Sequence, residues 1–153
     1  MTFTIAPADF ADERLSRLID DHLADMHATS PAESVHALDH TGLRTAKVSM
    51  WTISRNDALL GCGALKELSA SEGEIKAMRT TPEARGSGVG ARMLAFLLVQ
   101  ARERGYQRLS LETGTQPFFA PARRLYERHG FAECPPFADY VLDPASVFMT
   151  LEL

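Results

Sequence analysis

The stretch that decides the fold is Arg85-Gly86-Ser87-Gly88-Val89-Gly90, followed directly by strong helix formers from Ala91 to Arg102. Its three glycines remove the Cβ atoms that would keep a bulky ligand away from the backbone N–H groups. The glycines lie at a predicted helix N-terminus, where unpaired N–H groups and the helix dipole favour an anion. Arg85 adds a guanidinium suited to phosphate oxygens. The stretch is therefore predicted to bind a phosphate or pyrophosphate.

Three kinds of phosphate-binding loop compete for this pattern. A Walker A loop requires Gly-Lys-Ser/Thr, which the stretch lacks. The dinucleotide fingerprint GxGxxG/A is met by Gly86, Gly88 and Ala91, which leaves a nicotinamide-dinucleotide-binding enzyme as an alternative. Against it, residues 81–85 separate the glycines from the preceding strand, which is too polar for the centre of a parallel sheet. The third pattern, Arg-x-x-Gly-x-Gly, holds a coenzyme A pyrophosphate through amides and an arginine, and it is met in full.

The rest of the chain predicts an α+β order with one central βαβ crossover. Gly61 and Gly63 lie inside one predicted strand and indicate a bulge or a close backbone approach there. Asp9 is the predicted cap of the first helix. The predicted strands cover residues 3–6, 48–54, 59–65, 74–80, 107–112, 137–142 and 147–153. The predicted helices cover residues 11–26, 31–37, 91–102 and 117–129.

Residues 74–130 resemble the GCN5-related N-acetyltransferase (GNAT) family. The resemblance rests on Glu74–Arg79, the Arg85–Gly90 loop and Ala122–Phe131, which come in the family's order and at about its spacing. It implies a GNAT-like mixed, mostly antiparallel central sheet with helices on both faces, in which the strands flanking the crossover helix splay into a V. It also implies an acetyl-CoA-dependent N-acetyltransferase, in which a primary amine of a small molecule or amino acid attacks directly. A non-catalytic acyl-CoA-binding sensor module remains a further alternative.

Composition sets limits on the other properties. The 153 residues suit a single N-acetyltransferase domain over residues 1–153. The formal net charge of −4 argues against a broad nucleic-acid surface, so no nucleic-acid partner is expected. No apolar run is long enough for a membrane span, and the N-terminus lacks the features of a signal peptide. Two cysteines make no disulfide framework, which favours a cytoplasmic protein. The resemblance implies a possible homodimer.

Amide formation from a thioester needs a base for the amine and gains from an acid for the sulfur. On the resemblance, Glu74 is the candidate base, acting through water, and Tyr126 is the candidate acid. Glu112, at the end of the neighbouring strand, is the rival base. The predicted coenzyme-binding residues are Met78, Arg79 and Thr80, through their backbone groups, and Arg85, Gly86, Ser87, Gly88, Val89, Gly90 and Ala91, around the pyrophosphate.

Two further positions bear on the site. Many family members have a coenzyme-contacting asparagine where this chain has Phe119, and Thr113 or Thr115 could replace that contact. His36 and His40 have the i,i+4 spacing of a zinc pair, but the sequence offers no third ligand nearby, so no metal site is predicted. One of the histidines in residues 22–45 could instead line the acceptor pocket.

Overall fold

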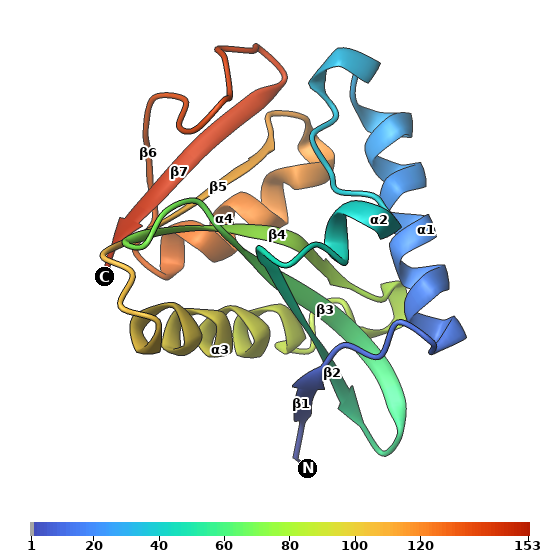
Figure 1. The fold of residues 1–153 in the computed structure, drawn as a ribbon. Helices are drawn as coiled ribbons and strands as arrows, with labels where there is room; N and C mark the ends of the chain where they lie inside the picture. The colour runs from blue at the N-terminus through green and yellow to red at the C-terminus, as the bar shows by residue number, and fades with distance from the viewer. Residues whose placement is uncertain (1) are drawn as a thin grey trace.

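A computed structural model of the chain, described here for residues 2–153, shows one sheet of seven strands with helices on both faces (Figure 1). The order across the sheet is β1-β2-β3-β4-β5-β7-β6, and only β4 and β5 pair in parallel. The predicted fold class is therefore confirmed. The strands are β1 (Thr4–Pro7), β2 (Val48–Arg55), β3 (Ala58–Glu67), β4 (Glu72–Thr80), β5 (Arg108–Gly114), β6 (Ala132–Glu133) and β7 (Ser146–Glu152). The helices are α1 (Glu13–Thr29), α2 (His40–Leu43), α3 (Val89–Glu103) and α4 (Ala120–Arg128).

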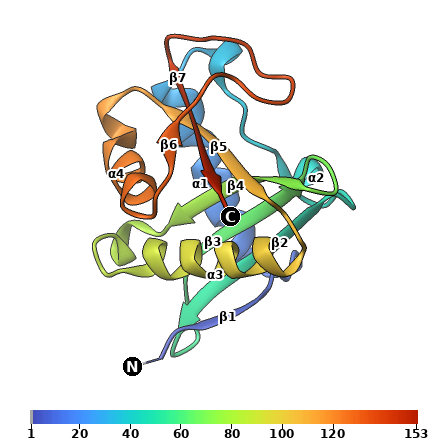
Figure 2. The same cartoon turned by 90° about the vertical axis from the view of Figure 1, so that its left-hand side faces the viewer.

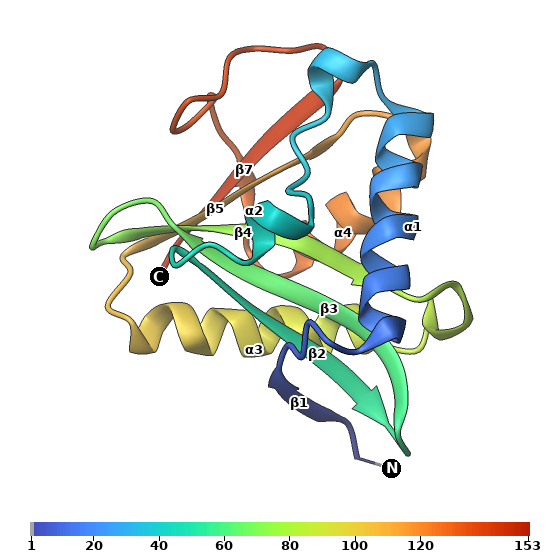
Figure 3. The same cartoon turned by 45° about the vertical axis from the view of Figure 1, so that its right-hand side comes forward.

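The helices divide the core into two clusters, one on each face of the sheet. Apolar residues of α3 and α4 pack against β3, β4, β5 and β7, with Leu94, Leu97 and Leu109 fully buried. Those of α1 and α2 pack against the other face of β2 and β3, around Leu15 and Leu43. Figures 2 and 3 show the two pairs of helices on opposite faces. Within residues 2–153, no helix combines the length and apolar character needed to cross a bilayer.

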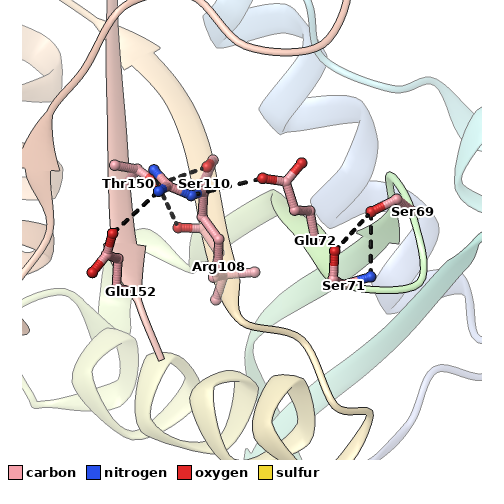
Figure 4. Close-up of polar contacts among 8 residues, drawn as sticks. Ser69, Ser71, Glu72, Arg108, Ser110, Thr150 and Glu152 are labelled. Carbon is pink, nitrogen blue, oxygen red and sulfur yellow. Dashed lines mark hydrogen bonds and ion pairs between the residues drawn. The ribbon is translucent and has the colours of Figure 1, made fainter.

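The parallel pair β4 and β5 opens into a V. The two strands pair only where Glu72–Glu74 faces Arg108–Ser110, and they diverge beyond this point (Figure 1). The closed end is tied by Arg108, whose guanidinium lies between Glu72 of β4, at 3.7 Å, and Glu152 of β7, at 3.2 Å (Figure 4). The splayed arrangement that the family resemblance implied is therefore present.

A bulge helps β4 to turn away from β5. Ala77 has a φ of 52°, and the β3–β4 register shifts between Cys62 and Ala64. A Cβ atom at Gly61 would lie 2.6 Å from the carbonyl oxygen of Arg79, so only glycine fits there. The predicted bulge or close approach at these glycines is confirmed.

The start of α1 differs from the prediction. Asp12, not Asp9, caps the helix, and its Oδ1 accepts a 2.9 Å hydrogen bond from the N–H of Arg14. Oδ1 of Asp9 instead accepts from the N–H of Ala11, at 2.9 Å, in the turn before the helix. Both aspartates satisfy a local amide, so the sequence alone could not distinguish the cap from the preceding turn.

The predicted helix over residues 31–37 is wrong. Only Ala32–Ser34 forms one 3₁₀ turn, and the next helix is the short α2. The hydroxyl of Ser34 donates to Oδ2 of Asp143 at 2.5 Å, and the carbonyl of His36 accepts from Nζ of Lys76 at 3.0 Å. These contacts to distant parts of the chain hold the segment extended, which local helix signals could not anticipate.

The predicted strand over residues 137–142 is also wrong. The strand that pairs with β7 on this side is β6, and residues 134–145 form a loop. Pro135 and Pro136 lack N–H donors for a ladder, and Ala138 has a φ of 52°. The loop returns to the sheet through Tyr140, whose hydroxyl donates to Glu74.

Candidate active site

A cleft of about 820 Å³ occupies the open end of the V. β4 and β5 form two of its walls, the loop before α3 and the start of α4 form one end, and α1 with the segment after it forms the other end. Most of the sequence-predicted site residues meet here, namely Tyr126, Met78, Arg79, Thr80, Arg85, Gly86, Gly88, Val89 and Gly90. Glu74, Ser87 and Ala91 do not line the cleft.

The glycine loop presents bare backbone to the cleft. Gly86 and Gly88 have φ values of 79° and 86°, and a Cβ atom at either would meet no heavy atom within 4 Å. Within residues 2–153, the amides of Gly86, Gly88 and the first three residues of α3 have no acceptor. The Ser87 hydroxyl instead bonds back to the carbonyl of Ala84. These free donors at a helix N-terminus fit a diphosphate.

Arginines from two elements add positive charge at this end. Arg85 lies in the loop, and Arg124 and Arg128 lie one turn apart on α4; all three line the cleft. Arg123 has a structural role, since its Nη1 donates to the carbonyls of Gly114, at 2.5 Å, and Gln116, at 3.2 Å. Guanidinium groups beside free amides are a chemical match for phosphate oxygens.

The end of β4 presents a free backbone edge beside the loop. Thr80 and Arg79 pair with Gly61 and Cys62 of β3 on one side. On the other side β5 has already diverged, because its pairing with β4 stops at Glu74. Met78, Arg79 and Thr80 line the cleft, and among residues 2–153 no strand pairs with them on this side of β4.

Glu74 is buried, with 2% of its surface exposed, and it is not a solvated carboxylate at a strand end. Its Oε2 accepts a 2.5 Å hydrogen bond from the Tyr140 hydroxyl and lies 3.4 Å from Nζ of Lys76. Lys76 lines the cleft, whereas Glu74 and Tyr140 lie behind it.

Glu112 of β5 faces the cleft directly. Burial raises the pKa of its carboxyl to about 7, and the negative charge of Glu74 adds to this, while Lys76 acts in the opposite direction. A carboxyl with a pKa near neutrality is suited to accept and release a proton. The sequence favours Glu74 as the base and leaves Glu112 as the rival. It cannot show which of the two carboxyls the fold turns toward the cleft, because this depends on residues far away in the chain.

Tyr126 of α4 also faces the cleft and is only 6% exposed. Burial raises the pKa of its hydroxyl, and the nearby charge of Glu112 raises it further, so the group stays protonated at neutral pH. Its ring packs against Phe131, with the ring centroids 5.8 Å apart. The side chain is thus both a core residue and a proton donor available to the cleft.

Of the two threonines that could replace the missing asparagine contact, one lines the cleft. Phe119 lines the cleft, and so does Thr113, whereas the Thr115 hydroxyl donates to the carbonyl of Pro144 at 2.9 Å. Thr113 is therefore the hydroxyl available for the missing polar contact.

The far end of the cleft is lined by α1 and the segment after it, including His22, Met26 and His36. Burial lowers the pKa of His22 to about 4, and the charge of Arg79 adds to this, so the ring is neutral at pH 7. His40 lies apart from His36 and pairs with Asp20 at 2.7 Å. Among residues 2–153, no group of three or more His, Cys, Asp or Glu side chains is placed to hold a metal.

Comparison with known proteins agrees with this geometry. A model of the acetyltransferase (GNAT) family matches residues 15–131. The chain belongs to this family. The uncharacterised N-acetyltransferase YsnE of Bacillus subtilis is 48% identical over 95% of this chain and 96% of its own length. A solved structure from Klebsiella pneumoniae, of a protein proposed to be an acyl-CoA N-acyltransferase, is 31% identical, with a TM-score of 0.83 over 99% of this chain and 98% of that one.

A more distant structure also has the fold of this acetyltransferase. A GNAT family acetyltransferase from Elizabethkingia anophelis, solved with acetyl-CoA bound, is 19% identical, with a TM-score of 0.68 over 99% of this chain and 98% of that one. The predicted family and enzyme class are confirmed. The nicotinamide-dinucleotide alternative is wrong, because the doubly wound parallel sheet it requires is absent: only β4 and β5 pair in parallel within residues 2–153.

Proposed function

We propose that this acetyltransferase moves an acetyl group from acetyl-CoA to the primary amine of a small molecule by direct attack. The observation that carries the proposal is a single cleft that joins the free amides before α3 to Glu112 and Tyr126. One part can hold a diphosphate, and the other can move protons. We also propose that residues 1–153 act as one cytoplasmic domain, which could form a homodimer.

The coenzyme end of the proposal rests on the loop and its arginines. The amides of Gly86, Gly88 and the first turn of α3, with Arg85, would hold the pyrophosphate. The unpaired edge of Met78–Thr80 would pair with the amide groups of the pantetheine arm. The relative solved with acetyl-CoA bound shares the fold, which supports this assignment.

Acetyl-CoA supplies the acetyl group as a thioester. In the reaction the C–S bond of the thioester breaks and a C–N bond to the amine forms. We propose Glu112 as the base that takes the proton from the amine nitrogen, because it lines the cleft and its pKa is about 7. Glu74, the candidate from sequence, would act only through water or by holding Lys76, since Tyr140 and Lys76 occupy its Oε2.

Tyr126 is the proposed acid, and its hydroxyl would donate a proton to the departing sulfur. Its raised pKa keeps the hydroxyl protonated at neutral pH, so that it can hydrogen-bond to the departing sulfur and donate to it. Proton transfers of this kind contribute roughly 10²- to 10⁴-fold to rate.

Two measurements on the purified protein test the proposal. The first is the melting temperature with and without acetyl-CoA, because a ligand at 100 times its Kd adds about 2.7 kcal/mol of stability. The second is free-thiol release from acetyl-CoA over a panel of amines. A raised melting temperature with thiol release for at least one amine supports the proposal. Tight binding without thiol release for any amine supports the acyl-CoA sensor instead, and no binding rejects both.

A further inference from the structure

The side chain of Arg79, a residue that lines the cleft, has a buried hydrogen-bond donor without a partner among residues 2–153. Arg79 lines the cleft, although only 7% of its side chain is exposed. Its Nη2 lies 2.8 Å from Oδ2 of Asp25 on α1, whereas its Nε is buried and has no acceptor among residues 2–153. A buried donor left unpaired destabilises the protein, and more so when it belongs to a charged group. An acceptor supplied by a ligand would remove that cost.

The other cationic side chains that line the cleft already have hydrogen-bond partners or lie where the diphosphate is proposed to bind. Lys76 has three N–H donors and three acceptors, which are the carbonyl of His36 at 3.0 Å, the Tyr140 hydroxyl at 2.9 Å and Glu74 at 3.4 Å. Arg85, Arg124 and Arg128 belong to the loop end, where the diphosphate is proposed to bind. Arg79 is therefore the cation with a donor left for the acceptor substrate.

From this arrangement, and resting on the proposed function, we infer that the acceptor amine carries a carboxylate and that the guanidinium of Arg79 binds it. A carboxylate oxygen can accept a charge-assisted hydrogen bond from a guanidinium N–H. Asp25 holds Nη2 and fixes the orientation of the group, so that Nε remains for the ligand.

The two ends of an amino acid fit the two strands of the V. Arg79 on β4 would take the carboxylate, and Glu112 on β5 would take a proton from the amine. His22, which lies near Arg79, is neutral at pH 7 and adds no competing charge. The acceptor class assigned by these contacts is an amino acid rather than a simple amine or a polyamine.

The test compares each amino acid with its own carboxamide. The probes are the L-amino acids, β-alanine and γ-aminobutyrate, each beside the matching amide, with kcat/KM measured by thiol release from acetyl-CoA. The amino group of the carboxamide is less basic, so at a given pH a larger fraction of it is neutral and able to attack. This difference favours the carboxamide and therefore cannot produce the expected preference for the acid. The wild-type protein should prefer the acid of its best pair by about tenfold or more, which corresponds to one lost charged hydrogen bond.

Two variants locate the source of the preference. Arg79→Gln removes the charge but keeps the backbone that is proposed to bind coenzyme, and its ratio of acid to amide should fall to about one. Asp25→Asn breaks the ion pair with Arg79 but leaves the guanidinium, so the preference for the acid should remain. If Asp25→Asn abolishes the preference as completely as Arg79→Gln does, Arg79 acts only by fixing α1 to β4, and the inference is overturned.

A readout independent of turnover is the melting temperature with coenzyme A and the best amino acid together. The amino acid should raise the melting temperature of the wild-type protein further and leave that of Arg79→Gln unchanged. If acetyl-CoA binds and simple amines release thiol while every acid fails, the carboxylate assignment is wrong and the proposed function survives. If acetyl-CoA itself has no effect, the proposed function fails together with the inference.

Discussion

The hydroxyl of Tyr140 donates a 2.5 Å hydrogen bond to Oε2 of Glu74, and so connects the loop after β6 to the centre of the sheet. Nζ of Lys76 donates to both groups, at 2.9 Å to Tyr140 and 3.4 Å to Glu74. A buried carboxylate, a half-buried phenol and an ammonium thus form one hydrogen-bonded group at the side of the cleft that Lys76 lines. Removing one member takes one hydrogen bond from each of the other two.

The first prediction concerns the stability of this group. Tyr140→Phe keeps the ring contacts but removes the hydroxyl, and it should lower the free energy of unfolding by about 1–3 kcal/mol, measured by urea denaturation. Tyr106→Phe is the matched control, because the Tyr106 hydroxyl has no hydrogen-bond partner within residues 2–153. Equal losses in the two variants would show that the Glu74 contact adds nothing to stability.

The second prediction separates the two candidate bases. The wild-type kcat/KM should rise with pH through about 7, as Glu112 loses its proton and becomes able to accept one. Glu112→Gln should lower kcat/KM by about 100-fold or more and remove this ionisation from the pH profile. Glu74→Gln should chiefly lower stability, because it disturbs the hydrogen bond from Tyr140. A large kinetic loss in Glu74→Gln, with Glu112→Gln near normal, would reverse the assignment.

The third prediction concerns Tyr126. Tyr126→Phe keeps the packing against Phe131 and removes only the hydroxyl, so the melting temperature should change little. The kcat for a thioester should fall by about 10²-fold, since the sulfur then leaves without a proton. An acyl donor with a less basic leaving group should lose less rate in this variant. An equal loss for both donors would argue against a role in protonating the leaving group.

The fourth prediction compares two glycines with similar backbone. Gly88 and Gly105 have φ values of 86° and 80°, and a Cβ atom at either would meet no heavy atom within 4 Å. Alanine at either position should cost about 1–2 kcal/mol of stability through the left-handed conformation. Only Gly88→Ala should also weaken acetyl-CoA binding, measured by titration calorimetry, because its methyl group would enter the cleft. Unchanged affinity in Gly88→Ala would mean that coenzyme does not lie on this loop.

The fifth prediction concerns stability against pH. The pKa of His22 falls from 6.5 to about 4 on folding, so its contribution is complete above pH 6.5 and is lost as pH falls through 4. The pKa of Glu112 rises from 4.5 to about 7, so its contribution is complete below pH 4.5 and is lost as pH rises through 7. Each effect has a size of about 3 kcal/mol, and the two oppose each other between pH 4.5 and 6.5.

Single variants should separate the two contributions when the free energy of unfolding is measured by urea denaturation at a series of pH values. With His22→Gln, the free energy of unfolding should fall as pH rises from 4.5 to 7. With Glu112→Gln, it should fall as pH drops from 6.5 to 4. Parallel profiles for the wild-type protein and both variants would mean that neither group has the stated pKa in the folded state.

The sequence predicted the glycine loop at a helix N-terminus correctly, and for a local reason. Gly86 and Gly88 need positive φ values, and the helix formers after them fix where unpaired amides must lie. The strand order around the crossover followed from the same stretch and from the family resemblance. By contrast, the segments at 31–37 and 137–142 were wrongly predicted, because contacts with distant residues override their local propensities.

Which groups line the cleft was decided only by the tertiary structure. Glu74 and Glu112 are both glutamates on neighbouring strands, and nothing near either in sequence tells them apart. The divergence of β4 from β5 opens the cleft in front of Glu112, while the loop that carries Tyr140 covers Glu74. Likewise, only the fold places Asp25 of α1 at Nη2 of Arg79 and leaves Nε without an acceptor among residues 2–153. The backbone of the glycine loop is set by its neighbours in the chain, whereas burial, pairing and pKa depend on what the fold brings from elsewhere.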